Sequence, residues 1–148
     1  MDELIQQIDI VLIEDNLHDA DLIIRTLKKN NVSNKLVHLS DGEDALNFLL
    51  SEGPYAYRKN HNKPHIILLD LNLPKLNGIE VLRKIKNDDR TRGIPVIILS
   101  VSSDAKNILE SYQIGVNGYI IKPLTFADFA KTISDLGYNW MLVNKVHK

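Results

Sequence analysis

The chain has 148 residues, of which 44% are hydrophobic and 25% are charged, and its formal net charge is −1. This length and composition indicate one globular domain with a substantial core, and the balanced charge provides no general attraction to nucleic acid or to an anionic membrane. The sequence has no cysteine, which excludes disulfides, thiolate metal sites and thiol catalysis. No apolar run approaches the roughly twenty residues that cross a bilayer, and the acidic start is unlike a signal peptide. We therefore expect a cytoplasmic protein that does not enter a membrane.

Five short apolar segments predict the strands of a β-sheet. Three of them contain near-continuous runs of branched residues (IVLI, IILL and VIIL), which is typical of strands buried on both faces of a parallel sheet. In chain order the segments are Ile8–Ile13, Leu36–Leu39, His65–Leu69, Pro95–Leu99 and Tyr119–Ile121.

Amphipathic helical stretches separate these segments. In the first of them Leu17, Ala20, Ile24 and Leu27 share one face, and the later stretches repeat this spacing. Capping boxes at Ser40–Glu43 and Thr125–Asp128 predict two of the helix starts. The order βαβαβαβαβα, with right-handed crossovers, predicts an α/β fold in which a doubly wound parallel sheet has helices on both faces.

Two segments stand apart from this alternation. The polar stretch 53–64 is interpreted as a surface insertion, and its basic residues Arg58, Lys59, His61 and Lys63 as a solvated loop, with a docking role as the alternative. The tail 137–148 carries apolar residues around Trp140, which cover either the protein's own surface or a second subunit. The five histidines show no metal-ligand spacing and are interpreted as ordinary surface or loop residues: His18, His38, His61, His65 and His147.

Polar residues end four of the predicted strands. In a doubly wound fold the carboxyl ends of the strands meet at one edge, where ligands bind. The residues at these ends are Glu14-Asp15, Asp70, Ser100 and Lys122-Pro123.

Together, these side chains predict a particular chemistry. Clustered carboxylates repel one another unless a cation lies among them, and an all-oxygen ligand set suits a hard ion such as Mg²⁺. An aspartate can act as a nucleophile on phosphorus, while a lysine and a hydroxyl bind the transferring group. The sequence therefore predicts a magnesium site at which an aspartate can accept a phosphoryl group.

These motifs resemble the response-regulator receiver domains of two-component signalling. The resemblance covers residues of about 8–136 and is carried by Glu14-Asp15, LLDLNLPKLNG around Asp70, PVIILS ending at Ser100, and GYIIKP ending at Pro123. It implies a flavodoxin-like sheet with strand order 2-1-3-4-5 in a single domain spanning residues 1–148. It also implies that a sensor histidine kinase donates the phosphoryl group in a phosphorelay, and that the output is a protein–protein interaction.

The resemblance further implies a role for each site residue. Asp70 is the expected phosphoacceptor, and Asp15 and Asp70 are expected to bind Mg²⁺ (with Mn²⁺ as a possible substitute). The backbone carbonyl of Asn72 is a further expected ligand, and Glu14 is expected to act through water. The remaining expectations are a switch hydroxyl at Ser100, a pairing cation at Lys122, an aromatic switch at Tyr119 and a cis bond before Pro123.

The sequence also departs from the family pattern. Glu14 stands where Asp is also common, and Ser100 stands where Thr is common. Val101 occupies a position at which many members have a smaller residue, so its branched side chain could restrict access to Asp70. Asn72 and Ser102 occupy positions that tune how readily water attacks the phosphoryl group.

A narrower resemblance links the chain to the small regulators of cyanobacterial and bacterial phytochrome kinases. It rests on the insertion before the third strand, on DLNLPKLNG and on the tryptophan near the C-terminus. It implies a light-sensing kinase as phosphodonor and a homodimer as a possible assembly.

Two other functions compete with this one. A receiver-like interaction domain that is never phosphorylated finds support only in Val101. A Mg²⁺-dependent phosphohydrolase would need an acid two residues beyond its nucleophile, where this chain has Asn72. We therefore expect no enzyme beyond self-phosphorylation and slow hydrolysis. Direct DNA binding is also unexpected, because no predicted helix is strongly basic.

Overall fold

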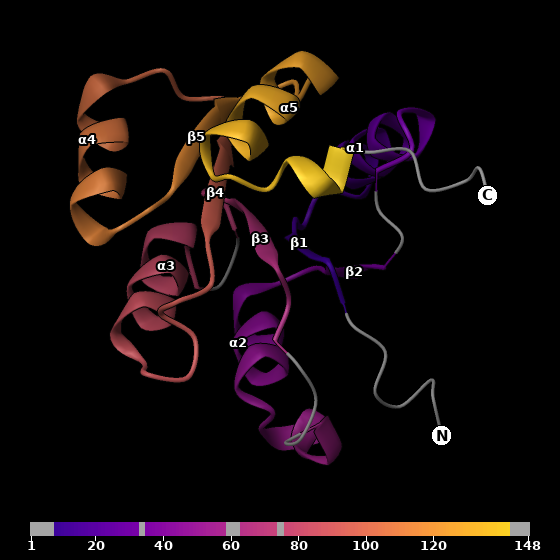
Figure 1. Ribbon diagram of the computed structural model, residues 1–148. Helices are drawn as coiled ribbons and strands as arrows, with labels where there is room; N and C mark the ends of the chain where they lie inside the picture. The colour runs from indigo at the N-terminus through magenta and orange to yellow at the C-terminus, as the bar shows by residue number, and fades with distance from the viewer. Residues whose placement is uncertain (1–7, 33–34, 59–62, 74–75, 143–148) are drawn as a thin grey trace.

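The five strands form one parallel sheet. The structure is a computed structural model that describes residues 8–32, 35–58, 63–73 and 76–142. The sheet has the order β2-β1-β3-β4-β5 (Figure 1), and all four neighbouring pairs are parallel. The predicted strand order is therefore confirmed. The strands are β1 (Ile10–Ile13), β2 (Leu36–Leu39), β3 (Ile66–Asp70), β4 (Val96–Ser100) and β5 (Gly118–Ile121).

The helices cover the sheet on both faces. One core cluster contains buried residues of α2 and α3, and the other contains buried residues of α1 and α5. β1, β3 and β4 are buried along their whole length, whereas three of the four residues of the edge strand β2 are half-buried. The helices are α1 (Leu17–Lys29), α2 (Gly42–Leu50), α3 (Gly78–Asn87), α4 (Ala105–Ile114) and α5 (Phe126–Asp135).

Every strand lies within two residues of its predicted bounds, and the second strand matches them at both ends. The first strand begins at Ile10 instead of Ile8, and the third and fourth each extend one residue further, to Asp70 and Ser100. The ladder explains the extension, because Asp70 pairs with Leu99 and Ser100 pairs with Ile121 in register. Both polar residues are therefore held by the backbone of the sheet itself.

One of the two predicted capping boxes is wrong by one residue. Thr125 caps α5 by accepting from the Asp128 amide, as expected, but α2 is capped by Asp41, whose side chain accepts from the Asp44 amide. Asp and Ser are comparable N-caps, so packing decides between them. Gly42 begins the helix so close to α3 that a Cβ there would lie 2.6 Å from a Val81 methyl.

The insertion packs against α2, so the interpretation of its basic residues as a solvated loop is wrong for Arg58, whereas Lys63 is exposed as expected. The insertion forms a short 3₁₀ helix, η2 (Gly53–Arg58), and Arg58 is only 8% exposed. The Arg58 guanidinium lies 3.8 Å from the centroid of the Phe48 ring, and its Nη1 donates to the Phe48 carbonyl oxygen at 3.1 Å. Sequence composition did not reveal this because the cation is stabilised by an aromatic face one helix away. Lys59 and His61 lie outside the described residues.

The start of the C-terminal tail covers the protein's own surface. A second 3₁₀ helix, η3 (Asn139–Leu142), follows α5 (Figure 1), and Met141 is 5% exposed within the cluster that also holds α1 and α5 residues. Tyr138 and Leu142 pack against the same cluster. The Trp140 side chain and residues 143–148 lie outside the described part of the chain. Among the described helices, none combines the length and the apolar character that crossing a membrane requires.

Candidate functional site

The predicted site residues meet at the carboxyl edge of the sheet. β1 and β3 pair in register from Ile10 with Ile66 to Ile13 with Leu69, so Glu14 and Asp70 each follow the last registered pair. Glu14, Asp70 and Ser100 are each at most 2% exposed, although they are polar or charged. Burial of such groups is costly unless they have partners, and the site supplies those partners.

Three carboxylates form a compact group. Glu14, Asp15 and Asp70 each offer one oxygen, and these oxygens all lie within 4.8 Å of one another. Burial raises the pKa of Glu14 to about 7; hydrogen bonding to Lys122 opposes the shift and the nearby Asp70 adds to it. A cation placed among these oxygens would remove the repulsion that the group otherwise carries.

The Lys122 ammonium lies within this carboxylate group. Its Nζ is 2.7 Å from Glu14 Oε1, 3.2 Å from Asp19 Oδ2 and 3.5 Å from Asp70 Oδ1. Burial disfavours the charged form of Lys122, but its hydrogen bond to Glu14 and the charge of Asp70 outweigh burial and raise its pKa. Lys122 therefore provides a fixed positive charge beside Asp70.

The donor set fits a hard divalent cation. Glu14 Oε1 is fully buried and pairs with the Lys122 ammonium at 2.7 Å. Together with Asp15 and Asp70 it forms an all-oxygen group within 4.8 Å, and oxygen ligands are the kind that Mg²⁺ or Mn²⁺ prefers in proteins.

Backbone contacts fix the position of Asp70. Its Oδ1 accepts from the Asn72 amide at 3.0 Å, and the Leu71 amide donates to the Leu99 carbonyl. The N-terminus of α3 packs directly on this turn, because a Cβ at Gly78 would lie 2.5 Å from the Asp70 carbonyl oxygen. Glycine at position 78 thus allows the helix to approach β3 at Asp70.

The ends of β4 and β5 are tied to each other. The Lys122 amide donates to the Ser100 carbonyl at 2.8 Å, and the Ser100 hydroxyl accepts from the Ser102 amide at 3.0 Å. The half-buried Tyr119 packs against the core and donates its hydroxyl proton to the Ser102 carbonyl at 3.0 Å. Ser100 and Tyr119 therefore contact the same short loop.

A groove opens beside Lys122. The Lys122–Pro123 peptide bond is cis. Val101 is 67% exposed and lines the groove, whose volume is about 250 Å³. The other lining residues are Asp19, Leu22, Ile23, Lys122, Pro123 and Leu124.

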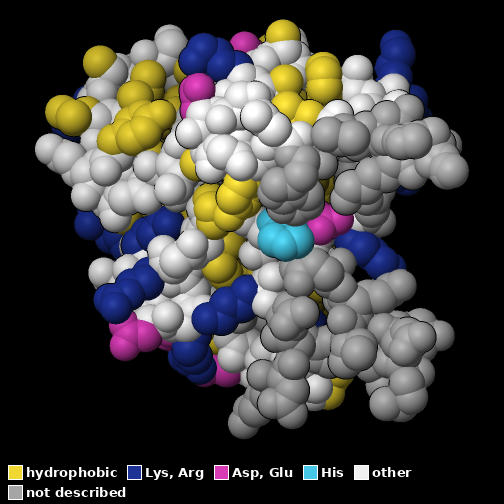
Figure 2. Space-filling model, viewed as in Figure 1, with side chains coloured by type: hydrophobic (Ala, Val, Ile, Leu, Met, Phe, Trp, Pro, Cys, Tyr) yellow, Lys and Arg dark blue, Asp and Glu magenta, His cyan; other side chains and the backbone are white. Residues whose placement is uncertain are grey.

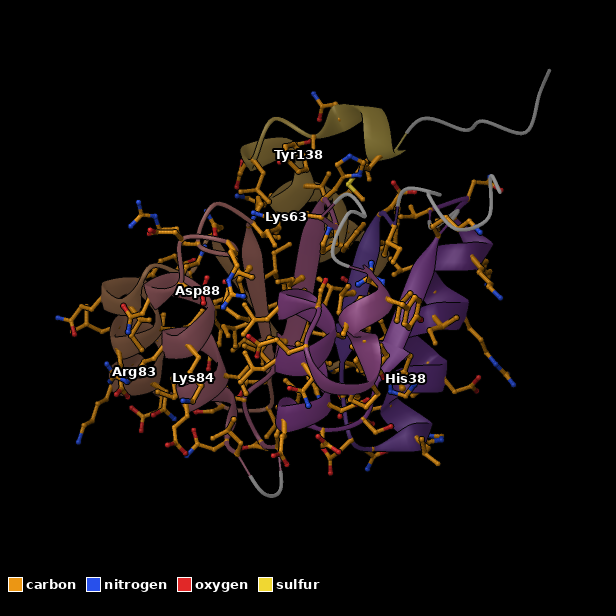
Figure 3. The ribbon with its side chains drawn as sticks, turned by 90° about the horizontal axis from the view of Figure 1, so that it is seen from below. His38, Lys63, Arg83, Lys84, Asp88 and Tyr138 are labelled. Atoms are coloured by element: carbon orange, nitrogen blue, oxygen red, sulfur yellow. The ribbon has the colours of Figure 1, made fainter. Side chains whose placement is uncertain are left out.

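Sequence reasoning overlooked two residues at this site. Asp19, in the first turn of α1, hydrogen-bonds Lys122 across 103 positions of sequence; its spacing of one helical turn from Asp15 is the only signal for it. His38 lies on β2 (Figure 3), where its Nε2 donates to the Glu14 carbonyl at 2.7 Å. The interpretation of His38 as an ordinary surface or loop residue is therefore wrong: β2 ends at Leu39, and the His38 side chain donates to the carbonyl beyond the end of the ladder.

The remaining histidines give a mixed result. His18 is exposed, whereas His65 is half-buried and its Nδ1 lies 2.9 Å from Asp9 Oδ1. His61 and His147 lie outside the described residues.

Two curated relatives cover most of the chain. It is 38% identical over 137 residues to the probable methanogenesis regulatory protein FilR2 of Methanothrix harundinacea. The aligned region covers 92% of this chain and 85% of FilR2. It is 36% identical over 132 residues to the response regulator Rcp1 of Synechocystis, which spans 89% of this chain and 88% of the relative.

Three solved structures have the same fold as this chain over most of their length. The bacteriophytochrome response regulator AtBRR has a TM-score of 0.84 and 40% identity, covering 95% of this chain and 99% of AtBRR. The Mn²⁺-bound form of Rcp1 has a TM-score of 0.72 and 34% identity, covering 94% and 96%. The phosphorylated cyanobacterial phytochrome response regulator RcpA has a TM-score of 0.74 and 38% identity, covering 92% and 95%.

The family model for the response regulator receiver domain matches residues 10–134. This range includes all five strands, all of α1 to α4, and all of α5 except its last residue, Asp135. This chain belongs to the response regulator receiver domain family.

Proposed function

We propose that this receiver accepts a phosphoryl group on Asp70 from a sensor histidine kinase. The observation that carries the proposal is the position of Asp70 Oδ1, 3.5 Å from the Lys122 ammonium and inside a carboxylate group of suitable size for a divalent cation. A nucleophile, a cation site and a fixed positive charge are the parts that phosphoryl transfer to an aspartate needs.

In this proposal Asp15 and Asp70 bind the cation directly, the Asn72 backbone carbonyl is a further ligand, and Glu14 acts through water. Mg²⁺ is the expected ion and Mn²⁺ a substitute, which the Mn²⁺-bound form of Rcp1 supports by similarity. The bound cation neutralises part of the charge on the transferring phosphoryl group.

The transfer step forms one bond and breaks one. An Asp70 carboxylate oxygen attacks phosphorus, and the bond from phosphorus to the donor's imidazole nitrogen breaks, so the electron pair leaves with the imidazole. Lys122 and the Ser100 hydroxyl bind oxygens of the transferred group. Attack by water on the same phosphorus later restores the carboxylate and releases phosphate. The protein turns over no other substrate.

The output is proposed to be a change in a protein-binding surface. When the Ser100 hydroxyl turns to the phosphoryl group it leaves the Ser102 amide, and the loop that holds the Tyr119 hydroxyl is free to shift. This loop leads into α4, where Figure 2 shows hydrophobic side chains at the surface and where Leu109 and Tyr112 are 59% and 49% exposed. Exposed apolar side chains close to the switch are suited to a partner protein.

The phosphodonor is proposed to be a phytochrome-type kinase in the cytoplasm. The support is similarity to AtBRR, RcpA and Rcp1, whereas the similarity to FilR2 leaves room for another sensor. A homodimer remains compatible with this function, and neither DNA nor a membrane is a proposed partner.

The competing functions have weaker support. Asn72 offers no acid two residues beyond Asp70, as a phosphohydrolase would need. For a receiver that is never phosphorylated, Val101 was the one supporting feature. Its side chain is mostly exposed on a groove wall beside Lys122.

Intact mass after incubation with acetyl phosphate tests the proposal. Wild-type protein with Mg²⁺ is expected to gain one phosphoryl group, and the gain is expected to disappear with EDTA or in Asp70→Asn. A folded wild-type protein that gains nothing, from acetyl phosphate or from a phosphorylated histidine kinase, would contradict the proposal.

A further inference from the structure

Asp19 is a fourth carboxylate at the site, and the metal group does not include it. That group consists of Glu14, Asp15 and Asp70, whereas Asp19 contacts the Lys122 ammonium at 3.2 Å. Asp19 is held in the first turn of α1, where its amide is capped by the Asn16 side chain at 2.9 Å. Its position is therefore fixed by the helix and directed at Lys122.

The Lys122 ammonium has as many carboxylate neighbours as it has protons. An ammonium offers three N–H donors, and Glu14, Asp19 and Asp70 lie within 3.5 Å of its nitrogen. A phosphoryl group on Asp70 also requires this ammonium. At least one existing contact must therefore weaken when Asp70 is phosphorylated.

Asp19 is the partner that Lys122 can release at the smallest cost. Glu14 is fully buried, so it would lose its counter-charge without gaining water, while the Asp19 side chain is 36% exposed and can be solvated as the pair separates. The negative charge of Asp19 also repels an incoming phosphoryl dianion at short range. The loss of the contact between Asp19 and Lys122 and the repulsion between Asp19 and the phosphoryl group both favour the unphosphorylated state.

We propose that Asp19 is a positioning residue that holds Lys122 in the unphosphorylated receiver and releases it to the phosphoryl group on Asp70, a role that rests on the function proposed above. Asp19 thereby lowers the phosphorylated fraction that a given donor concentration produces. It acts only through Lys122 and binds neither the cation nor the phosphoryl group.

The first test compares Asp19→Asn with Asp21→Asn in the full chain. Asp21→Asn is a matched control because it removes the same charge from the same helix. The Asp21 carboxylate is 55% exposed and pairs with Arg25 at 2.9 Å. The measurement is the ratio of phosphorylated to unphosphorylated protein by intact mass, at steady state with subsaturating acetyl phosphate and Mg²⁺. We expect Asp19→Asn to raise this ratio by about threefold to tenfold, and Asp21→Asn to change it by less than about twofold.

The sign of the effect separates this role from a structural one. Damage to α1 would disturb the adjacent Glu14 and Asp15 and lower the ratio, whereas release of Lys122 raises it. Asp19→Ser is expected to raise it as well. Equal ratios for Asp19→Asn and Asp21→Asn, or a ratio below that of wild type, would overturn the proposal.

A second measurement does not depend on phosphorylation. A double-mutant cycle with Asp19→Asn and Lys122→Met, read by urea unfolding in EDTA, is expected to show a coupling of about twofold to fivefold in the unfolding constant. Absence of coupling would overturn the holding contact. If coupling is present but the wild type takes up no phosphoryl group, the function proposed above fails and the release step fails with it. If the wild type is phosphorylated and Asp19→Asn behaves as Asp21→Asn, only the role of Asp19 fails.

Discussion

Glu14 is a carboxylate with no exposed surface that lies 2.7 Å from Lys122 and beside Asp70. Burial raises its pKa from 4.5 to about 7, so without a bound cation the folded protein keeps the protonated form to a higher pH than the unfolded chain does. A divalent cation favours the ionised form instead. Proton binding and cation binding therefore compete at this one side chain.

This competition predicts how stability depends on pH. Because the folded-state pKa of Glu14 lies above its unfolded value, its contribution to stability is fully present below pH 4.5 and is lost as the pH rises through about 7. In EDTA, Glu14→Gln is expected to remove this loss and to be more stable than wild type at pH 8 by on the order of 2 kcal/mol. Urea unfolding at pH 5 and pH 8 measures the difference.

The same substitution should weaken cation binding. Mg²⁺ is expected to stabilise the wild type more at pH 8 than at pH 5, and to stabilise Glu14→Gln much less than the wild type at pH 8. An equal Mg²⁺ response of the two proteins would show that Glu14 takes no part in the cation site.

At the scale of elements, α3 approaches the acceptor strand through a glycine. A Cβ at Gly78 would lie 2.5 Å from both the Asp70 carbonyl oxygen and the Leu71 Cα, which are backbone atoms that cannot turn aside. We therefore expect Gly78→Ala to destabilise the fold by about 1–3 kcal/mol and to reduce phosphoryl uptake, because the turn after Asp70 must shift. Gly93→Ala is the matched control, since its Cβ would meet nothing within 4 Å; similar losses in the two variants would contradict this explanation.

For the contact between η2 and α2, we expect a substitution to change stability but not phosphoryl uptake. Arg58→Ala removes the guanidinium from the Phe48 ring and from the Phe48 carbonyl, so it is expected to destabilise the fold by about 1–3 kcal/mol. Arg58→Lys keeps the charge but loses the planar group, and should recover only part of this loss. Phosphoryl uptake by the folded protein should not change, and a fall in uptake for Arg58→Ala without a loss of stability would instead point to a docking role.

The strands were the most predictable elements, and the reason is physical. Strands buried on both faces leave uninterrupted apolar runs in the sequence, and parallel strands bring their carboxyl ends to one edge. The sequence alone therefore predicts that Glu14, Asp70 and Lys122 lie together. The α2 start was less predictable, because Ser40 and Asp41 are both suitable caps and the close contact of Gly42 with Val81 decides between them.

Contacts between side chains of distant elements could not be predicted. Helical periodicity predicts the buried Ala20 and Leu27 of α1, but Leu17 is 71% exposed and Ile23 is buried instead of Ile24. Nor does it predict that Asp19 meets Lys122 from the end of β5. The hydrogen bond of His38 depends on where β2 ends, and the burial of Arg58 depends on the Phe48 ring in α2. In each case a polar side chain found a partner that only the tertiary structure supplies.

At the scale of the whole molecule, the fold brings residues from four strand ends into one buried site and connects it to the surface of α4. Asp70 is separated from Glu14 by 56 positions and from Lys122 by 52, as their residue numbers show. The whole sheet must therefore be folded before this site is complete. A response regulator built in this way couples its chemistry to the integrity of the domain.

The central claim is that Asp70 itself carries the phosphoryl group, and chemical trapping of the phosphorylated full chain tests it most directly. Borohydride reduces an aspartyl phosphate to homoserine, so peptide mass mapping identifies the modified position. We predict homoserine at position 70 only, formed only after incubation with the phosphodonor and Mg²⁺. Homoserine at another aspartate, or a stable phosphate ester on Ser100 with Asp70 unchanged, would contradict the account.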